Sequence, residues 1–175
     1  MELIFRKANK DDVRVIVDIY ERTHDAEEAG ETTIGWIRGV YPTRDTAEAA
    51  LDRDDMYVCD YDGKVIASAV INQIQVDVYE GANWEYEADD DKVLVLHTLD
   101  VDHDYKHLGV GRAFVEFYEK LALEQGCTVL RMDTNERNAI ARKFYAKMGY
   151  READVKPTVF NGIPGVNLIL LEKEL

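Results

Sequence analysis

The chain has 175 residues, which is enough for one domain with a sizeable core and too few for two. It contains 35 acidic and 21 basic residues, for a net charge of −14, and this excess argues against a nucleic-acid ligand because a phosphate backbone requires a basic surface. The two cysteines, Cys59 and Cys127, lack the spacing of a disulfide framework or a zinc site, so we expect no metal and a reducing compartment.

The N-terminal third of the sequence predicts one strand and two helices. Residues 2–6 have the composition of a short strand. Asn9 is placed to cap a helix from about Lys10 to His24, in which apolar residues recur at helical spacing. The pattern breaks between Asp25 and Pro42, and a second helix is expected from Thr43 to about Arg53.

The middle of the sequence predicts a hairpin, a loop and a central strand. Asp62 and Gly63 lie between two β-rich runs, which is a strong hairpin signal. Residues 77–91 form an acidic loop dotted with aromatic residues. Residues 92–101 are at first apolar on both faces, which is typical of a strand covered on both sides.

The C-terminal part continues the alternation of helices and strands. A helical apolar face follows the central strand and closes at Gly126, and residues 127–134 have the pattern of the next strand. Residues 136–149 predict a helix that ends at Gly149, a natural C-cap, and residues 167–174 predict a final strand.

The sequence lacks repeats, low-complexity tracts and linkers, so residues 1–175 are interpreted as a single mixed α/β domain. Its apolar runs fall short of the roughly 18 residues of a membrane span, and the opening MELIFRKANKDD has too short an apolar stretch for a signal peptide. We therefore expect a cytoplasmic protein that binds neither a membrane nor nucleic acid.

The stretch KHLGVGR, residues 106–112, lies at the predicted junction between the central strand and the next helix. Free amides at a helix N-terminus bind phosphate readily, and glycine lets a ligand approach the backbone closely. Two known phosphate loops do not match, because the dinucleotide fingerprint needs glycine where Phe114 stands and the triphosphate loop needs Gly-Lys-Ser/Thr. These residues alone leave a phosphate cradle and an ordinary turn equally open.

Two longer blocks resemble the GCN5-related N-acetyltransferase (GNAT) family. The stretch LDVDHDYKHLGVGRAFVEF resembles the family's motif A, with matching positions at Leu99, Val101, Lys106, Gly109 and Gly111. The stretch NERNAIARKFYAKMGY resembles its second block, with matching positions at Asn135, Asn138, Ala141, Phe144, Tyr145, Gly149 and Tyr150. The order of the predicted elements also fits, so the resemblance covers nearly the whole chain.

The resemblance implies a GNAT fold, a twisted and mostly antiparallel sheet splayed at its central strands and flanked by helices. It also implies direct transfer of an acetyl group from acetyl-CoA to an amine, without a covalent enzyme intermediate and without a metal. The residues that it assigns to the coenzyme are Leu99, Val101, Lys106, His107, Leu108, Gly109, Val110, Gly111, Arg112, Asn138, Ala141 and Tyr145. The chain departs from the family at Lys106, where Arg or Gln is commoner, at His107, where Gly is frequent, and at His103, where Pro is frequent.

Tyr145 and Val101 are the residues that the resemblance places at the reacting thioester. Tyr145 would protonate the leaving thiolate, although its helical face is also typical of a core. The backbone N–H of Val101 would polarise the acetyl carbonyl. Asn138 would contact the pantetheine arm of the coenzyme, and a helix-start asparagine is an equally good interpretation.

His97 interrupts the apolar central strand at a position where many family members carry Glu. A histidine titrates near neutrality and can remove the proton of the amine, whereas the alternative is a buried histidine bonded to the backbone. Asp100 and Asp133 are weaker candidates for the base, expected to orient neighbours or to face solvent. The other histidines, including His24, are expected on the surface or in loops.

The identity of the acceptor is open, and we expect a small-molecule or peptide amine. The aromatic residues expected as walls of its binding site are Trp36, Tyr41, Tyr79, Trp84 and Tyr86. The acidic residues Glu85, Glu87 and 89–91 either attract a cation or form a solvated loop. The alternative functions are a non-catalytic acyl-CoA-binding or regulatory domain and a transferase that uses a longer acyl-CoA. The sequence is also compatible with a homodimer.

Overall fold

The computed structural model describes residues 2–175. These residues contain a single seven-stranded sheet with the strand order β1-β2-β3-β4-β5-β7-β6. The strands are β1 (Leu3–Lys7), β2 (Met56–Tyr61), β3 (Lys64–Asn72), β4 (Val93–Val101), β5 (Val129–Asn135), β6 (Arg151–Phe160) and β7 (Ile163–Glu174). The helices are α1 (Val13–Glu28), α2 (Arg44–Asp52), α3 (Val110–Glu124) and α4 (Ala139–Lys147). Short 3-10 turns are η1 (Lys10–Asp12), η2 (Asp77–Tyr79), η3 (Asp90–Lys92) and η4 (His103–Leu108).

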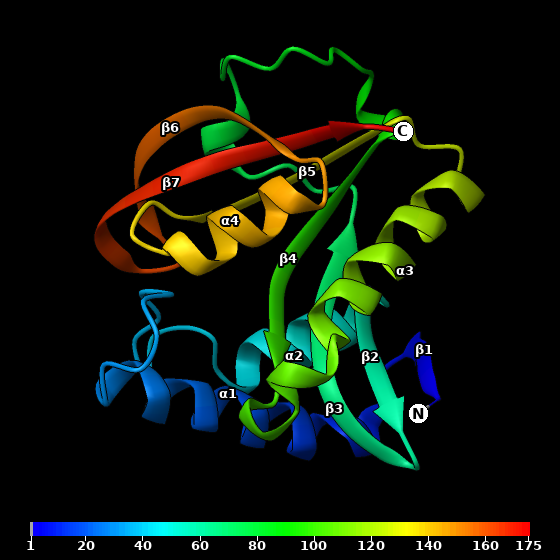
Figure 1. Ribbon diagram of the computed structural model, residues 1–175, viewed down its shortest axis with the longest axis vertical. Helices are drawn as coiled ribbons and strands as arrows, with labels where there is room; N and C mark the ends of the chain where they lie inside the picture. Colours follow the sequence, from blue (N-terminus) through cyan, green and yellow to red (C-terminus); the bar gives the residue numbers. More distant parts are fainter. Residues whose placement is uncertain (1) are drawn as a thin grey trace.

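The helices cover the two faces of the sheet, α3 and α4 on one face and α1 and α2 on the other (Figure 1). The core beneath α3 and α4 contains Phe114 and Tyr118, and the hydroxyl of Tyr118 donates to the carbonyl of Leu94 at 2.6 Å. On the opposite face, the segment between β3 and β4 folds over β5 and β7 and packs Tyr79 against Val95 and its neighbours. The apolar character of β4 on both faces follows from this double cover.

The central strands β4 and β5 separate part-way along their length. They are the sheet's parallel pair, and their register begins at Val93 with Val129 and ends at Leu96 with Met132. Beyond this point β4 contains a bulge, where the register with β3 shifts and Thr98 has a φ of 51°. The predicted splay of a mostly antiparallel sheet at its central strands is therefore confirmed.

Three local features differ from the sequence-based expectations. The strand β6 had no predicted counterpart, because its alternating pattern is that of an edge strand with few fully buried residues. The helix expected from residue 136 begins at Ala139, since Asn138 is its N-cap. His24 is buried rather than on the surface, and its Nε2 lies 3.0 Å from the carbonyl oxygen of Pro42. Within residues 2–175, the helices fall short of the length and apolar character needed to cross a membrane.

Candidate active site

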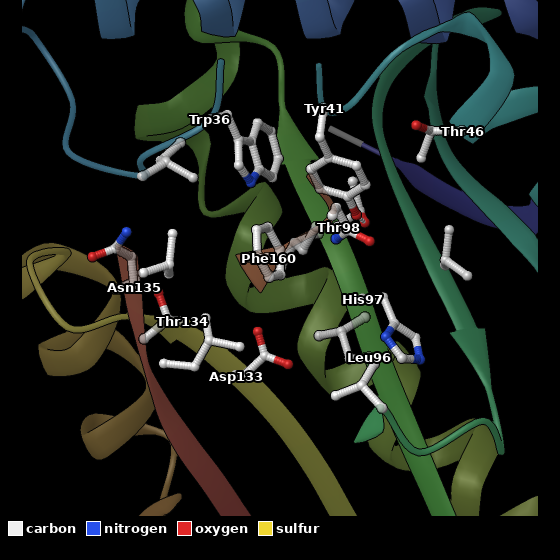
Figure 2. Close-up of a pocket in the computed structure, with 18 of the residues that line it drawn as sticks. Trp36, Tyr41, Thr46, Leu96, His97, Thr98, Asp133, Thr134, Asn135 and Phe160 are labelled. Carbon is white, nitrogen blue, oxygen red and sulfur yellow. Dashed lines mark hydrogen bonds between the residues drawn. The ribbon is translucent and has the colours of Figure 1, made fainter. Parts of the chain in front are cut away.

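A cavity of about 700 Å³ opens where β4 and β5 separate. Its walls come from the segment between α1 and α2, from α2, β3, the end of β4, the end of β5, β6, β7 and α4. Figure 2 shows several of these side chains, among them Tyr41 before α2, His97 on β4 and Asp133 on β5. Because the strands no longer pair at this level, the cavity extends through the sheet from the α2 side to Tyr145 of α4.

The glycine loop joins η4 to α3 and leaves backbone amides free. Gly109 has a left-handed conformation with a φ of 75°, which glycine adopts without strain, and it caps the N-terminus of α3. The first helical hydrogen bond runs from the amide of Ala113 to the carbonyl of Gly109 at 3.0 Å. The preceding amides of Val110, Gly111 and Arg112 therefore lack helical partners and can receive an anion.

Side chains around this loop leave the backbone open. Lys106, His107 and Leu108 are exposed, and Arg112 forms an ion pair with Glu116 at 2.8 Å. A Cβ on Gly111 would lie 3.9 Å from the side chains of both Val101 and Phe144. The loop therefore adjoins the end of β4 and the face of α4 that leads to the cavity.

The backbone N–H of Val101 points into the gap between the strands. The amide of Asp102 donates to the carbonyl of Ile66 on β3 at 2.9 Å, and Val101 pairs opposite Ala67. Since successive amides of a strand point to opposite sides, the Val101 N–H is directed away from β3 and toward the space that β5 has left. The amide at this place can donate to an oxygen bound in the gap.

Tyr145 and Asn138 reach the cavity from α4. Tyr145 is 9% exposed and packs against Phe144 and Tyr150, with ring centroids 5.1 and 5.9 Å away. Burial, and to a lesser degree the charge of Asp133, raises the pKa of its hydroxyl above the usual value. The side chain Oδ1 of Asn138 accepts from the amide of Ala141 at 3.1 Å, and both residues line the cavity. The capping role and a ligand contact of Asn138 are thus compatible.

His97 lines the cavity from β4 as a neutral ring. Its Nε2 lies 2.9 Å from Oδ1 of Asn72, which also accepts from the amide of Ile74 at 2.9 Å, while Nδ2 of Asn72 donates to Asp55 at 2.9 Å. These partners fix the amide orientation of Asn72, so Nε2 of His97 carries the proton. Burial lowers the pKa of His97 to about 4, which makes it a weaker base than a histidine in water.

Asp133 on β5, which the sequence analysis ranks below His97 as a candidate base, also lines the cavity. Its Oδ2 accepts from the hydroxyl of Tyr79 at 2.7 Å. Burial raises the pKa of this carboxyl to about 6. The signal available in the sequence was an acidic residue in an otherwise apolar strand. Asp100, in contrast, points to α1, where it accepts from Thr23 at 2.8 Å.

Aromatic side chains form the wall of the cavity opposite α4. Tyr41 lies edge-to-face with Trp36 and Phe160, at centroid distances of 6.0 and 5.2 Å, and its hydroxyl is hydrogen-bonded to Thr98. Trp36 and Tyr41, which the sequence analysis names as acceptor walls, thus line this cavity. Phe160 was missed because it ends β6, the strand without a sequence signal.

The remaining expected acceptor residues lie elsewhere. Tyr79, Trp84 and Tyr86 belong to the core on the outer side of β5 and β7, so they do not line this cavity. The acidic loop also lies on the outer side of β5 and β7, where Glu85, for example, forms an ion pair with Arg151 at 3.0 Å. Its charges therefore do not line the cavity. Among residues 2–175, groups of three or more His, Cys, Asp or Glu suited to a metal are absent.

Known structures share this fold. A GNAT-family acetyltransferase of Listeria monocytogenes superposes with a TM-score of 0.77 at 21% identity, covering 100% of this chain and 96% of that one. The ribosomal-protein-S18-alanine N-acetyltransferase of Escherichia coli superposes with a TM-score of 0.68 at 17% identity, covering 99% of this chain and 94% of that one. At these identities the likeness shows the GNAT fold.

The family follows from the sequence match. Residues 16–150 match the model of the acetyltransferase (GNAT) family, and the chain belongs to this family. An uncharacterised N-acetyltransferase of Methanocaldococcus jannaschii is 24% identical over 104 residues, a stretch that covers 59% of this chain and 42% of the relative. The chain thus matches less than half of that relative's length.

Proposed function

We propose that this protein is an acetyl-CoA-dependent N-acetyltransferase that moves the acetyl group to a primary amine by direct attack. The observation that carries the proposal is the cavity at the splay of β4 and β5. It brings together the gap faced by the Val101 N–H, the hydroxyl-bearing side chain of Tyr145 and the carboxyl of Asp133.

Coenzyme binding is assigned to the glycine loop and α4. The amides from His107 to Arg112 would hold the pyrophosphate, with Lys106 adding an exposed positive charge, and Asn138 and Ala141 would contact the pantetheine arm. The free amides and the left-handed Gly109 fit an anionic diphosphate at this place.

Each remaining group has one task in the transfer. The amine nitrogen forms a bond to the acetyl carbon while the carbon–sulfur bond breaks, and the Val101 N–H donates to the carbonyl oxygen as it gains negative charge. Tyr145 donates its proton to the thiolate; its raised pKa means that the hydroxyl is protonated at neutral pH and is a weaker acid than a phenol in water.

Two groups in the cavity can remove the proton of the amine, Asp133 and the sequence-predicted His97. With a pKa of about 6, Asp133 is the better-matched base near neutral pH, because a His97 with a pKa of about 4 accepts a proton weakly. We therefore assign the base to Asp133 and a supporting role to His97, whose ring would orient the acceptor or a water.

Direct attack is favoured by the position of the cysteines. Cys59 and Cys127 are buried outside the cavity lining, and burial raises the pKa of the Cys59 thiol to about 11, so it stays protonated. A covalent acetyl-cysteine intermediate has no thiol in the cavity on which to form.

The test is release of free thiol from acetyl-CoA in the presence of a panel of primary amines, with the acetylated product identified by mass spectrometry. Thiol release that requires both protein and amine is expected. Tight acetyl-CoA binding without release for any amine would identify a non-catalytic binding domain instead. Faster release from propionyl-CoA or a longer thioester would identify a different acyl donor.

A further inference from the structure

We propose that the acceptor carries a carboxylate in addition to its primary amine, and that Arg53 binds this carboxylate. The proposal rests on the proposed acetyl transfer and names the chemical class of the acceptor, which the two sequence motifs leave open.

Arg53 directly follows α2, and its side chain lines the cavity. Its Nε donates to Oδ2 of Asp55 at 2.8 Å and its Nη2 donates to Oδ1 at 3.2 Å. Within residues 2–175, Nη1 makes no hydrogen bond. Two nitrogens therefore fix the plane of the guanidinium, and the third remains free to bind a carboxylate of a ligand.

A buried hydrogen-bonded chain holds this guanidinium in place. Asp55 is 7% exposed, and besides Arg53 it accepts from Nδ2 of Asn72 at 2.9 Å. Asn72 in turn accepts from His97 on β4 at 2.9 Å. Because Asp55 offsets much of the charge of Arg53, recognition depends on directed hydrogen bonds from Nη1, and the rigid support lowers the entropy that binding would cost.

The charges of the cavity are arranged for a ligand with two opposite charges. Among the lining residues, Arg53 is the Arg or Lys side chain and Asp133 is the Asp or Glu side chain. Arg53 is connected through Asp55 to Asn72 on β3, Asp133 lies on β5, and β4 lies between these two strands. Burial raises the pKa of Tyr41 to about 12, and the nearby charge of Arg53 opposes this rise; burial lowers the pKa of His97 to about 4, and the charge of Arg53 adds to this decrease. The positive charge of Arg53 therefore acts on groups that line the cavity.

The acceptor amine has to reach Asp133, Tyr145 and the Val101 amide to react. An acceptor that is held there extends its other end across β4 toward Arg53, whose side chain is 45% exposed at the rim. The separation of the two charges favours an amino acid in which several bonds separate the amine from the carboxylate.

The experiment compares matched pairs of acceptors. Glycine and ω-amino acids of increasing length are each tested beside the corresponding carboxamide, which keeps the amine and the shape but removes the negative charge. We expect kcat/KM for at least one acid to exceed that of its amide by about 10- to 100-fold, the size expected for a charge-assisted hydrogen bond.

The variants separate recognition from folding. Arg53→Gln should abolish the preference for the acid, mainly through a higher KM for the acid. Since Arg53→Gln leaves the buried Asp55 without its partner and threatens folding, the double variant Arg53→Gln/Asp55→Asn removes both charges together. Arg44→Gln is the matched control, because Arg44 lies exposed on the same helix and pairs with Glu48.

Binding is measured in parallel by titrating the acids and amides into the protein with CoA, which requires no turnover. Weaker binding of acids to the double variant than to the Arg44→Gln control supports the proposal. Equal use of acids and amides by the wild type, or an acid preference that survives in the double variant, overturns it. Absence of transfer to any amine, with acid binding that depends on Arg53, would contradict only the proposed acetyl transfer.

Discussion

Tyr145 keeps its proton at neutral pH, since a phenol ordinarily has a pKa of about 10 and burial raises the pKa of this hydroxyl further. Tyr145→Phe removes this hydroxyl and little volume. We expect turnover to fall by about 10²- to 10⁴-fold, the usual effect of losing a general acid, with acetyl-CoA affinity nearly unchanged. Steady-state kinetics and a binding titration measure the two quantities. A variant that turns over as fast as the wild type would leave Tyr145 with a packing role alone.

The pH dependence of turnover distinguishes Asp133 from His97. A base works only when deprotonated, so the rate falls as pH decreases through its pKa, which is about 6 for Asp133 and about 4 for His97. If Asp133 is the base, Asp133→Asn should lose both turnover and the decline near pH 6. His97→Gln should keep that decline.

The acceptor amine also titrates, so the profile has to be repeated with two acceptors of different pKa. A decline that moves with the acceptor belongs to the substrate, and one that stays belongs to the protein. Retention of the decline in Asp133→Asn together with its loss in His97→Gln would restore the sequence-based assignment of His97 as the base.

The turn between β4 and α3 would bind the coenzyme through its backbone amides rather than through its side chains. Gly109→Asp places a negative charge beside the free amides of α3 and should abolish coenzyme binding. Gly109→Asn is the matched control, because Asn has nearly the same shape and both residues tolerate a φ of 75° better than most. Calorimetry should show much weaker acetyl-CoA binding for Asp than for Asn. Equal affinities would place the pyrophosphate elsewhere.

The bulge in β4 is held by the segment that precedes α2. Thr98 is a β-branched residue with a φ of 51°, a conformation that costs on the order of 1–3 kcal/mol, and the hydroxyl of Tyr41 is bonded to its side chain. This contact connects a wall of the cavity to the strand that contains Val101. We therefore regard Tyr41 as a positioning residue for the bulge.

Tyr41→Phe should lower kcat by about 10-fold, the scale of one hydrogen bond, with a smaller effect on the KM for acetyl-CoA. Adding Thr98→Gly should restore part of the rate, because glycine adopts a positive φ without an anchor. Tyr86→Phe is the control, since Tyr86 lies outside the cavity. Unchanged kinetics in Tyr41→Phe would show that the bulge keeps its shape without this bond.

At the scale of the whole molecule, the coenzyme would bridge the turn between β4 and α3 and the more distant helix α4. Binding to the native state alone stabilises a protein by mass action, by about 2.7 kcal/mol at a ligand concentration 100 times Kd. Acetyl-CoA and free CoA should therefore raise the melting temperature, and NAD and ATP should not. A melting curve that does not shift in millimolar acetyl-CoA would contradict the coenzyme assignment.

The sequence by itself determined the parts of this protein that are contiguous in the chain. The glycine loop, the central strand around Val101 and the helix with Asn138 and Tyr145 each carry their pattern within a few residues, so the family and its fold could be predicted from them. In the glycine loop and in the strand around Val101, the expected ligand contacts come from backbone amides, and a short local pattern is enough to specify backbone geometry.

Only the tertiary structure decided which residues line the cavity and how burial shifts the pKa values of its acids and bases. Arg53, Phe160 and Asp133 come from α2, β6 and β5 and meet because of the order of the strands, which leaves no local signal in the sequence. The same holds for Tyr79 and Trp84, whose aromatic character suits a core as well as a binding site. The pKa values of Asp133 and His97 depend on burial, and burial exists only once distant segments have packed together.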